Sequence, residues 1–193
     1  RVQSATKGNV LLRKRQYQLS DDESWSLHVA RLMIGGKIQN YRNILKRYIR
    51  DYGENENINR AVQVLEHAKR EALATQDKTT LIGYEGMASN AYFEVLPVLI
   101  LNQKADFPFH GRNRRPPKDA VNAMLSFAYT LIANDTSAAL ETVGLDPYVG
   151  FLHTLRPGRT SLALDMMEEL RAYLGDRFVL SLINKRQITS KDF

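Results

Sequence analysis

One stretch, residues 20–52, decides the fold class and reads SDDESWSLHVARLMIGGKIQNYRNILKRYIRDY. Ser20 and Glu23 have the spacing of a capping box, which predicts that a helix begins there. Apolar residues then recur at helical spacing to the end of the stretch. They are Trp25, Leu27, Val29, Leu32, Met33, Ile38, Tyr41, Ile44, Leu45, Tyr48 and Ile49. The pattern predicts one long helix, in which Gly35 and Gly36 either weaken the helix or let a neighbour pack closely.

The rest of the chain carries further helical patterns and no convincing set of alternating strands. Helices are expected over residues 58–75, 79–102, 118–134, 137–143 and 161–184. Residues 106–117 (DFPFHGRNRRPP) contain three prolines and a glycine and are expected to form a loop. The prediction is an all-α domain of about six to eight helices over residues 20–193, preceded by a connector over residues 1–19 that holds a short strand-like run.

The composition excludes several classes of protein. The chain has 193 residues, of which 44% are hydrophobic, enough for a globular core. Without cysteine it has no disulfide and no thiolate metal site, which leaves His, Asp and Glu as metal ligands. No segment approaches the roughly 18 apolar residues of a membrane span, so we expect a cytoplasmic protein with no membrane partner. A net charge of +6 favours contact with phosphates.

Asp165 and Glu168 stand three residues apart in GFLHTLRPGRTSLALDMMEELR, residues 150–171. They therefore share one face of the predicted last helix. Their neighbours are apolar, and a buried carboxylate needs a cation as partner. The alternative is a solvated acidic face paired with Arg171, because surface ion pairs are common and weak.

Two further residues are candidate ligands. His153 ends the apolar run YVGFLH, where the chain leaves the core for a loop. Glu85 lies in YEGMASNAYF, inside the most apolar predicted helix, where an unpaired carboxylate would destabilise the fold. The alternatives are a buried pair between Glu85 and an arginine, and a purely structural histidine.

Imidazole and carboxylate ligands suit Mg²⁺, Mn²⁺ or Zn²⁺. Such a site can activate a hydroxyl nucleophile, stabilise a leaving oxygen and neutralise a phosphate. Arginines frame it, namely Arg156 and Arg159 in LRPGRTS and Arg112, Arg114 and Arg115 in RNRRPPK. Since backbone phosphates dominate affinity for nucleic acid, this arrangement favours phosphodiester chemistry on nucleic acid.

Three longer motifs, taken in order, resemble the CRISPR-associated integrase of spacer acquisition, the Cas-one family. They are YEGMASNAYF (84–93), FHGRNRRPPKDAVNAMLSFAYTLI (109–132) and GLDPYVGFLHTLRPGRTSLALDMMEELR (144–171). The runs KGNVLLRKRQY and KIQNYRNILKR also resemble the family's connector and first helix. The resemblance covers essentially all 193 residues and is strongest to the subtype I-C branch.

The resemblance implies a catalytic all-α domain, with the family's N-terminal β-rich domain absent. It implies that Glu85, His153 and Glu168 are the metal and catalytic residues, that Asp165 supports them, and that the metal is Mg²⁺ or Mn²⁺. Glu168 stands where some relatives have Asp. The implied reaction is transesterification, in which the 3′-hydroxyl of a prespacer DNA attacks a phosphodiester of a CRISPR array. Metal-dependent endonuclease cutting is a related activity.

The resemblance also implies three partners. They are double-stranded and branched DNA, a second copy in a homodimer of the full-length protein, and the small Cas-two protein. The chain begins without Met and ends where the family continues. We therefore interpret it as a C-terminal domain fragment.

Two other functions stay open. A helical nucleic-acid-binding module without catalysis is favoured by the net charge and by RNRRPPK, residues 112–118. An interaction domain with structural carboxylates would be favoured by a buried pair between Glu85 and an arginine. In either case Tyr92 is expected in the core.

Overall fold

The computed structural model describes residues 9–193, and this range contains helices and loops but no strand. The helices are α1 (Val10–Asp21), α2 (Glu23–Tyr52), α3 (Glu56–Ala74), α4 (Lys78–Leu99), α5 (Ala120–Thr142), α6 (Ser161–Leu170) and α7 (Arg177–Asn184). A π-helical turn, η1 (Arg171–Asp176), joins α6 to α7, and a 3₁₀ turn, η2 (Ser190–Asp192), lies near the C-terminus. The predicted all-α class is confirmed.

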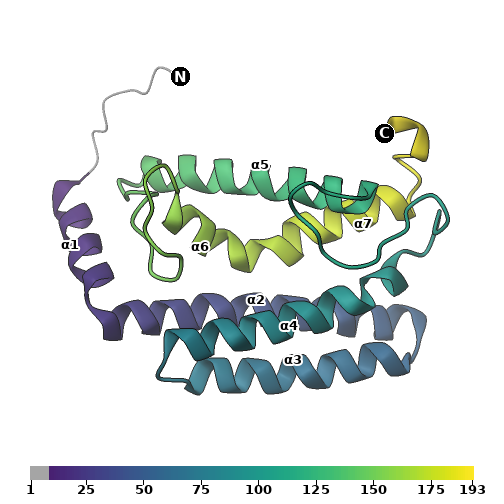
Figure 1. Cartoon of the computed structure of the whole chain (residues 1–193), viewed down its shortest axis with the longest axis horizontal. Helices are drawn as coiled ribbons and strands as arrows, with labels where there is room; N and C mark the ends of the chain where they lie inside the picture. Colours follow the sequence, from purple (N-terminus) through teal and green to yellow (C-terminus); the bar gives the residue numbers. More distant parts are fainter. Residues whose placement is uncertain (1–8) are drawn as a thin grey trace.

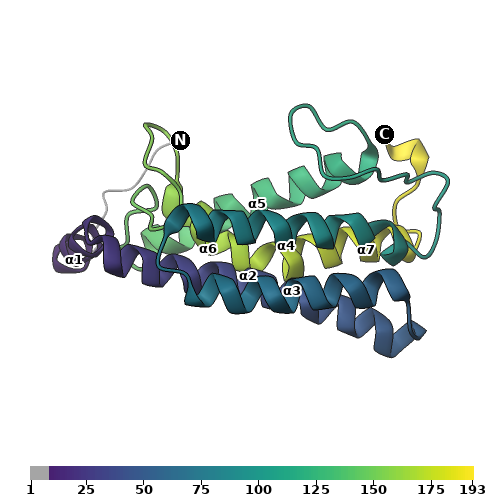
Figure 2. The same cartoon turned by 60° about the horizontal axis from the view of Figure 1, so that its bottom comes forward.

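Two layers of helices make up the fold (Figure 1). Helices α2, α3 and α4 form one layer, and α5, α6 and α7 form the other. Helix α2 contacts α3 and α4 within its layer and also contacts α6 and η1 across the interface. Turned by 60°, the molecule shows α4, α6 and α7 running in nearly the same direction (Figure 2). Helix α2 is therefore the element from which side chains reach both layers.

Close packing around α2 depends on its two glycines. A Cβ at Gly35 would lie 2.8 Å from Cδ2 of Leu73 in α3, and one at Gly36 would lie 2.9 Å from Cδ of Glu169 in α6. Both distances are shorter than real Cβ contacts. The prediction that Gly35 and Gly36 let a neighbour pack closely is therefore confirmed. The glycines let α2 approach the helices on its two sides.

The beginning of α2 differs from the prediction. Asp22 caps the helix by accepting hydrogen bonds from the backbone N–H groups of Ser24 and Trp25. Ser20 belongs to α1, where its hydroxyl donates to the carbonyl of Tyr17, so the predicted Ser20–Glu23 capping box is wrong. Residues 1–8 of the predicted connector lie outside the described residues, and from Val10 the chain is helical and not strand-like.

Helix α1 holds the loop that precedes α6. The buried side chain of Gln16 donates to the carbonyls of Asp146 and Val149, at 2.8 Å each, and accepts from the backbone N–H of Asp146 at 2.9 Å.

Among the described residues, no helix combines the length and the apolar character that crossing a bilayer requires.

Candidate active site

The candidate site lies where α2, α4 and α6 meet. Glu85 comes from α4 and Glu168 from α6, and the ammonium of Lys37 in α2 lies between their carboxylates. Lys37 Nζ is 2.7 Å from Glu168 Oε2 and donates a hydrogen bond to Glu85 Oε1. Ser89, one turn after Glu85, donates to the same Glu85 oxygen at 2.8 Å. Two carboxylates from different helices therefore converge on one cationic position.

Glu168 is 3% exposed and has a second cationic neighbour. Arg171, one turn later, brings Nη2 to 2.9 Å from Glu168 Oε1. Burial by itself raises the pKa of the Glu168 carboxyl, but Lys37 and Arg171, with a smaller effect of His153, outweigh it and hold that pKa below its usual value. The other oxygen, Oε2, faces the ammonium of Lys37, so each oxygen of the Glu168 carboxylate is paired with a different cation.

Lys37 is 1% exposed and stays protonated in this environment. Burial by itself lowers the pKa of its ammonium. Tyr41, Glu168 and Glu85 raise that pKa by more than burial lowers it, so the net shift is upward. A buried ammonium needs such partners, because an unpaired charge in the interior is very unfavourable. The pair of carboxylates supplies them.

Asp165 organises the loop that carries His153. Its carboxylate is completely buried and accepts hydrogen bonds from the backbone N–H groups of Phe151, Leu152 and His153 at 2.6 to 2.9 Å. His153 Nδ1 lies 2.6 Å from Asp165 Oδ1, and because an ionised carboxylate only accepts, Nδ1 is the donor. A Cβ at Gly150 would lie 2.5 Å from Asp165 Oδ2, so the loop needs glycine at this position.

This hydrogen bond fixes the orientation of the His153 ring and makes Nε2 the ring nitrogen that is not bound to Asp165. An imidazole that donates Nδ1–H to a carboxylate is the usual arrangement of a metal-ligating histidine, because the carboxylate orients the ring and raises its basicity. Asp165 and Glu168 lie one turn apart on α6, so His153 is held beside the Glu168 carboxylate.

The fit of a metal ion can be judged from these contacts. Within residues 9–193, no three His, Asp or Glu side chains converge closely enough to hold a metal ion as they stand. Two carboxylates do converge on a cation, the Lys37 ammonium. Carboxylate oxygens with one imidazole are a donor set that Mg²⁺ and Mn²⁺ accept. By the chemistry of their donor atoms, Glu85, Glu168 and His153 would suit a divalent ion, and the Lys37 ammonium lies between the two carboxylates.

The sequence left open a solvated acidic face and a partner arginine for Glu85. The solvated face is wrong, because Asp165 and Glu168 are buried, although Arg171 is indeed a partner of Glu168. The partner of Glu85 is a lysine and not an arginine. Lys37 is the residue that sequence reasoning missed. The sequence did contain a sign of it. Lys37 stands four residues after Met33 and four before Tyr41, which places it on the buried face of α2.

The candidate DNA-binding arginines fall into two groups. Arg112 is half-buried and donates to the side chains of Asn122 at 2.8 Å and Ser126 at 3.0 Å, with its guanidinium 5.4 Å from the ring centre of Tyr129. It fixes the loop before α5, and burial lowers its pKa somewhat. The others are open to solvent, with Arg114, Arg115 and Arg156 exposed and Arg159 partly exposed.

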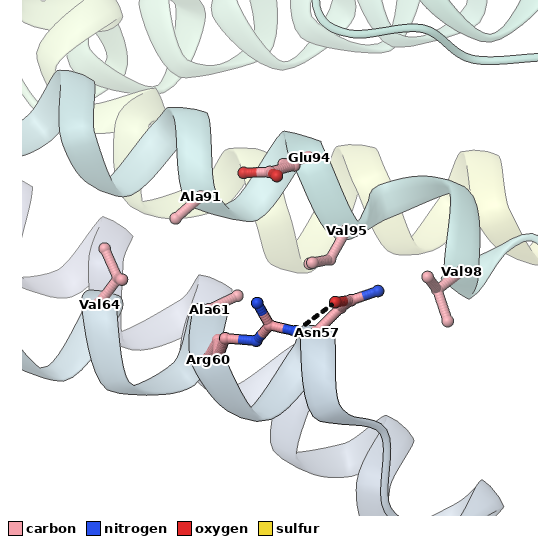
Figure 3. Close-up of a pocket in the computed structure, with 8 residues that line it drawn as sticks. All are labelled: Asn57, Arg60, Ala61, Val64, Ala91, Glu94, Val95 and Val98. Carbon is pink, nitrogen blue, oxygen red and sulfur yellow. Dashed lines mark hydrogen bonds between the residues drawn. The ribbon is translucent and has the colours of Figure 1, made fainter.

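A pocket of about 350 Å³ lies elsewhere, between α3 and α4 (Figure 3). Arg60 and Glu94 are the charged residues that line it, and Arg60 donates to Asn57 at 3.3 Å. None of the candidate site residues lines this pocket. The candidate site is not an open cavity, because the Lys37 side chain fills the space between its two carboxylates.

The fold and site define an all-helical domain in which two carboxylates meet at a buried lysine, beside a histidine held by an aspartate. The chain belongs to the family described as CRISPR associated protein Cas1, whose model matches residues 1–193. This confirms the family that the sequence motifs indicated. The subtype I-C branch and the position at the C-terminal end of a longer protein stay predictions.

Known relatives place the chain in more detail. It is 49% identical over 195 residues to the CRISPR-associated endonuclease Cas1 1 of Chlorobaculum tepidum, with all of this chain and 57% of that protein covered. The structure of a partial Cas6-RT-Cas1–Cas2 complex matches with a TM-score of 0.86 at 27% identity, over 99% of this chain and 56% of that one. A casposase bound to an integration product matches with a TM-score of 0.78 at 27% identity, over 95% and 52%. The chain thus spans little more than half of these proteins.

Proposed function

We propose that this chain carries the active site of a metal-dependent DNA integrase and endonuclease of CRISPR spacer acquisition. The observation that carries the proposal is the convergence of Glu85 and Glu168, from two helices, on one buried cationic position beside His153. The comparisons support it, because the Chlorobaculum relative is an endonuclease by name and the casposase was solved on an integration product.

In this proposal Glu85, His153 and Glu168 hold Mg²⁺ or Mn²⁺. When bound, the ion supplies charge for the scissile phosphate and for the attacking and leaving oxygens. The 3′-hydroxyl of the incoming DNA forms a new P–O bond at a phosphodiester of the array, and the old bond to the leaving 3′-oxygen breaks. The attacking hydroxyl loses its proton, and the leaving 3′-oxygen gains one.

In this proposal other residues of the chain position the side chains of Glu168 and His153 and contact the DNA. Asp165 holds the His153 ring with Nε2 directed away from its own carboxylate. Arg171 holds one oxygen of Glu168 and leaves the other for the cation. Arg156 and Arg159, in the loop between His153 and α6, would bind the DNA backbone on the phosphate side, and Arg114 and Arg115 would extend that contact.

The predicted partners follow from the same relatives. The solved complex contains Cas1 and Cas2, so the small Cas2 protein is a proposed partner of this chain. DNA is the second, as in the casposase complex. Branched DNA and a homodimer of the longer protein are further parts of the proposal.

Strand transfer on a labelled branched DNA with Mn²⁺ tests the proposed function. Glu168→Gln removes the buried charge, and the matched control is Glu169→Gln, the exposed glutamate next to it on α6. We expect Glu168→Gln and His153→Ala to lose roughly 100-fold or more of the joined product, since even residues behind metal ligands cost 10- to 100-fold. The control should join at the parent rate. Equal product from Glu168→Gln and Glu169→Gln would refute the proposal.

A second function has one specific observation in its favour. The carboxylates of Glu85 and Glu168 are already neutralised by Lys37 and Arg171, as a purely structural ion-pair cluster would be. The chain would then be a helical nucleic-acid-binding module without catalysis. It predicts DNA affinity unchanged in Glu168→Gln and no Mn²⁺-dependent cutting by either protein. A fluorescence anisotropy titration beside the strand-transfer assay separates the two functions.

A further inference from the structure

The position between Glu85 and Glu168 is held by a group of the protein itself. The Lys37 ammonium is completely enclosed, 2.7 Å from Glu168 Oε2 and hydrogen-bonded to Glu85 Oε1. A Mg²⁺ or Mn²⁺ ion bound to the same two oxygens would lie about 2.1 Å from each. The ammonium and the ion would therefore occupy one place, and they exclude each other.

The charges lead to the same conclusion. Glu85, Glu168 and Asp165 bring three negative charges, and Lys37 and Arg171 bring two positive ones. A divalent ion added to these five groups would leave one excess positive charge in the interior, which is unfavourable. If the ammonium leaves, the charges of the ion and of the four remaining groups cancel.

One side of the cluster is open enough for this exchange. The Glu85 side chain is 24% exposed, whereas the Glu168 and Lys37 side chains are 4% and 2% exposed. An ion can thus approach from the Glu85 side. The lysine has a flexible four-carbon stem, so its ammonium can change position by rotation about side-chain bonds.

We propose that Lys37 is an internal competitor of the catalytic metal, which keeps the two carboxylates together in the metal-free protein and must withdraw before the ion binds. The inference rests on the proposed function, because it takes Glu85 and Glu168 as metal ligands. Metal binding and the burial of Lys37 are then mutually exclusive states. A DNA phosphate would favour the metal-bound state, because it can pair with the withdrawn Lys37 ammonium in place of the two carboxylates.

Mn²⁺ binding, measured by loss of the free-ion electron paramagnetic resonance signal, tests the competition. Lys37→Met removes the competing charge and keeps most of the side-chain volume. We expect its Mn²⁺ dissociation constant to be at least tenfold lower than that of the parent. Lys46→Met, an exposed lysine on the same helix, removes the same charge and should leave the constant unchanged. Equal Mn²⁺ affinity of the parent and Lys37→Met would overturn the inference.

A double variant separates this failure from failure of the proposed function. Glu168→Gln in the Lys37→Met protein should abolish the gain in affinity. If that variant loses Mn²⁺ binding but Lys37→Met binds no more tightly than the parent, the metal site stands and the competition is refuted. If no protein binds Mn²⁺ in a Glu168-dependent way, the proposed function fails and the inference fails with it.

A measurement on the unchanged protein avoids any folding defect of the variants. Amine acetylation followed by mass spectrometry reports whether a lysine is accessible. Lys37 should be protected without metal and acetylated at least fivefold more with saturating Mn²⁺, while labelling of Lys46 stays constant. Persistent protection of Lys37 at a Mn²⁺ concentration that saturates the site would contradict the inference.

Discussion

Asp165 is a buried charge whose hydrogen-bonding capacity is fully used. Oδ2 accepts from Phe151 and Leu152, and Oδ1 accepts from both the backbone and the ring of His153. Four donors on two oxygens match the acceptor capacity of an ionised carboxylate. The residue therefore acts on the candidate site through the loop that it holds and not as a ligand of its own.

Asp165→Asn tests this role. In either orientation, the new amino group faces two of the four donors, which leaves them buried and unsatisfied. We expect a loss of about 2–4 kcal/mol in the free energy of unfolding, since each such group costs about 1–3 kcal/mol. Urea denaturation measures the change. The exposed-site control Glu169→Gln should stay within about 0.5 kcal/mol of the parent, as surface substitutions usually do. A similarly small effect of Asp165→Asn would contradict the role.

Asp176 gives the protein a specific pH dependence. Burial raises the pKa of its carboxyl to about 6, although the Tyr129 hydroxyl that donates to it acts in the opposite direction. In the unfolded chain the pKa is about 3.9, so the folded state binds the proton more tightly. The contribution of Asp176 to the free energy of unfolding therefore falls as pH rises from about 4 to about 6 and is level above, with a total effect of roughly 3 kcal/mol.

Asp176→Asn removes this titration and keeps an acceptor for Tyr129. Relative to the parent, the variant should gain stability between pH 4 and pH 6 by up to about 3 kcal/mol and gain no more at higher pH. Urea unfolding of both proteins at several pH values gives the difference, in which the other carboxylates cancel. A difference that is constant from pH 4 to pH 7.5 would show that Asp176 does not titrate in this range.

At this scale the sequence predicted some side chains and missed others. The carboxylates stood out because acidic residues within apolar helices need partners, and the core position of Tyr92 is confirmed by its complete burial. The identity of the partners could not be predicted. Which cation reaches Glu85 depends on the packing of α2 against α4, and helical periodicity says nothing about that.

The π-helical turn η1 is the element that departs most from the prediction of one helix over residues 161–184. Gly175 lies in it, and a Cβ there would be 2.8 Å from Cε1 of Tyr129. Tyr129 cannot yield, because its ring lies beneath the guanidinium groups of Arg112 and Arg171 and its hydroxyl is bonded to Asp176. Wide turns of this kind occur often at functional sites, and this one begins at Arg171, the partner of Glu168.

Two glycine substitutions test the packing of η1. Gly175→Ala should destabilise the protein by about 1–3 kcal/mol, the usual effect of overpacking a core. Gly83→Ala, in α4 with nothing near its added Cβ, should stabilise it by about 0.5–1 kcal/mol through helix propensity. Thermal melts of the two variants should therefore shift in opposite directions. A stabilising effect at both positions would mean that η1 has room for a methyl group.

The boundaries of α3, α4 and α5 show how far hydrophobic periodicity predicts where a helix begins and ends. The predicted helices over residues 58–75 and 79–102 agree closely with α3 and α4. The two predicted helices over residues 118–134 and 137–143 are one helix, α5. The residues between them, Asp135 and Thr136, include neither Gly nor Pro, so nothing in the chain stops the helix there.

At the scale of the molecule, the excess of positive charge should act through the exposed arginines. Arg112 anchors the loop of residues 106–117, so Arg114 and Arg115 are presented from a fixed support. The arrangement of helices in two layers, by contrast, could not be predicted. Amphipathic faces show that each helix is buried on one side, but not against which neighbour.

The salt dependence of DNA binding tests this presentation. If Arg114 and Arg115 each contact a phosphate, replacing both by Ala should reduce the slope of log affinity against log salt by about 1.8, or 0.9 for each contact. Fluorescence anisotropy at several KCl concentrations measures the slope. The double control Arg50→Ala and Arg70→Ala removes two exposed arginines from α2 and α3. An equal change in both proteins would mean that only net charge matters.

The loop that carries His153 is fixed on both sides of a short exposed segment. Gln16 holds residues 146–149, Asp165 holds residues 151–153, and residues 154–158 are exposed. A chain break in that segment would give two pieces that remain associated through the contacts of α6 with α2 and α5. One piece would carry Glu85 and His153 and the other Asp165 and Glu168. The side chains of the candidate site are thus divided between two segments of the chain that only folding brings together.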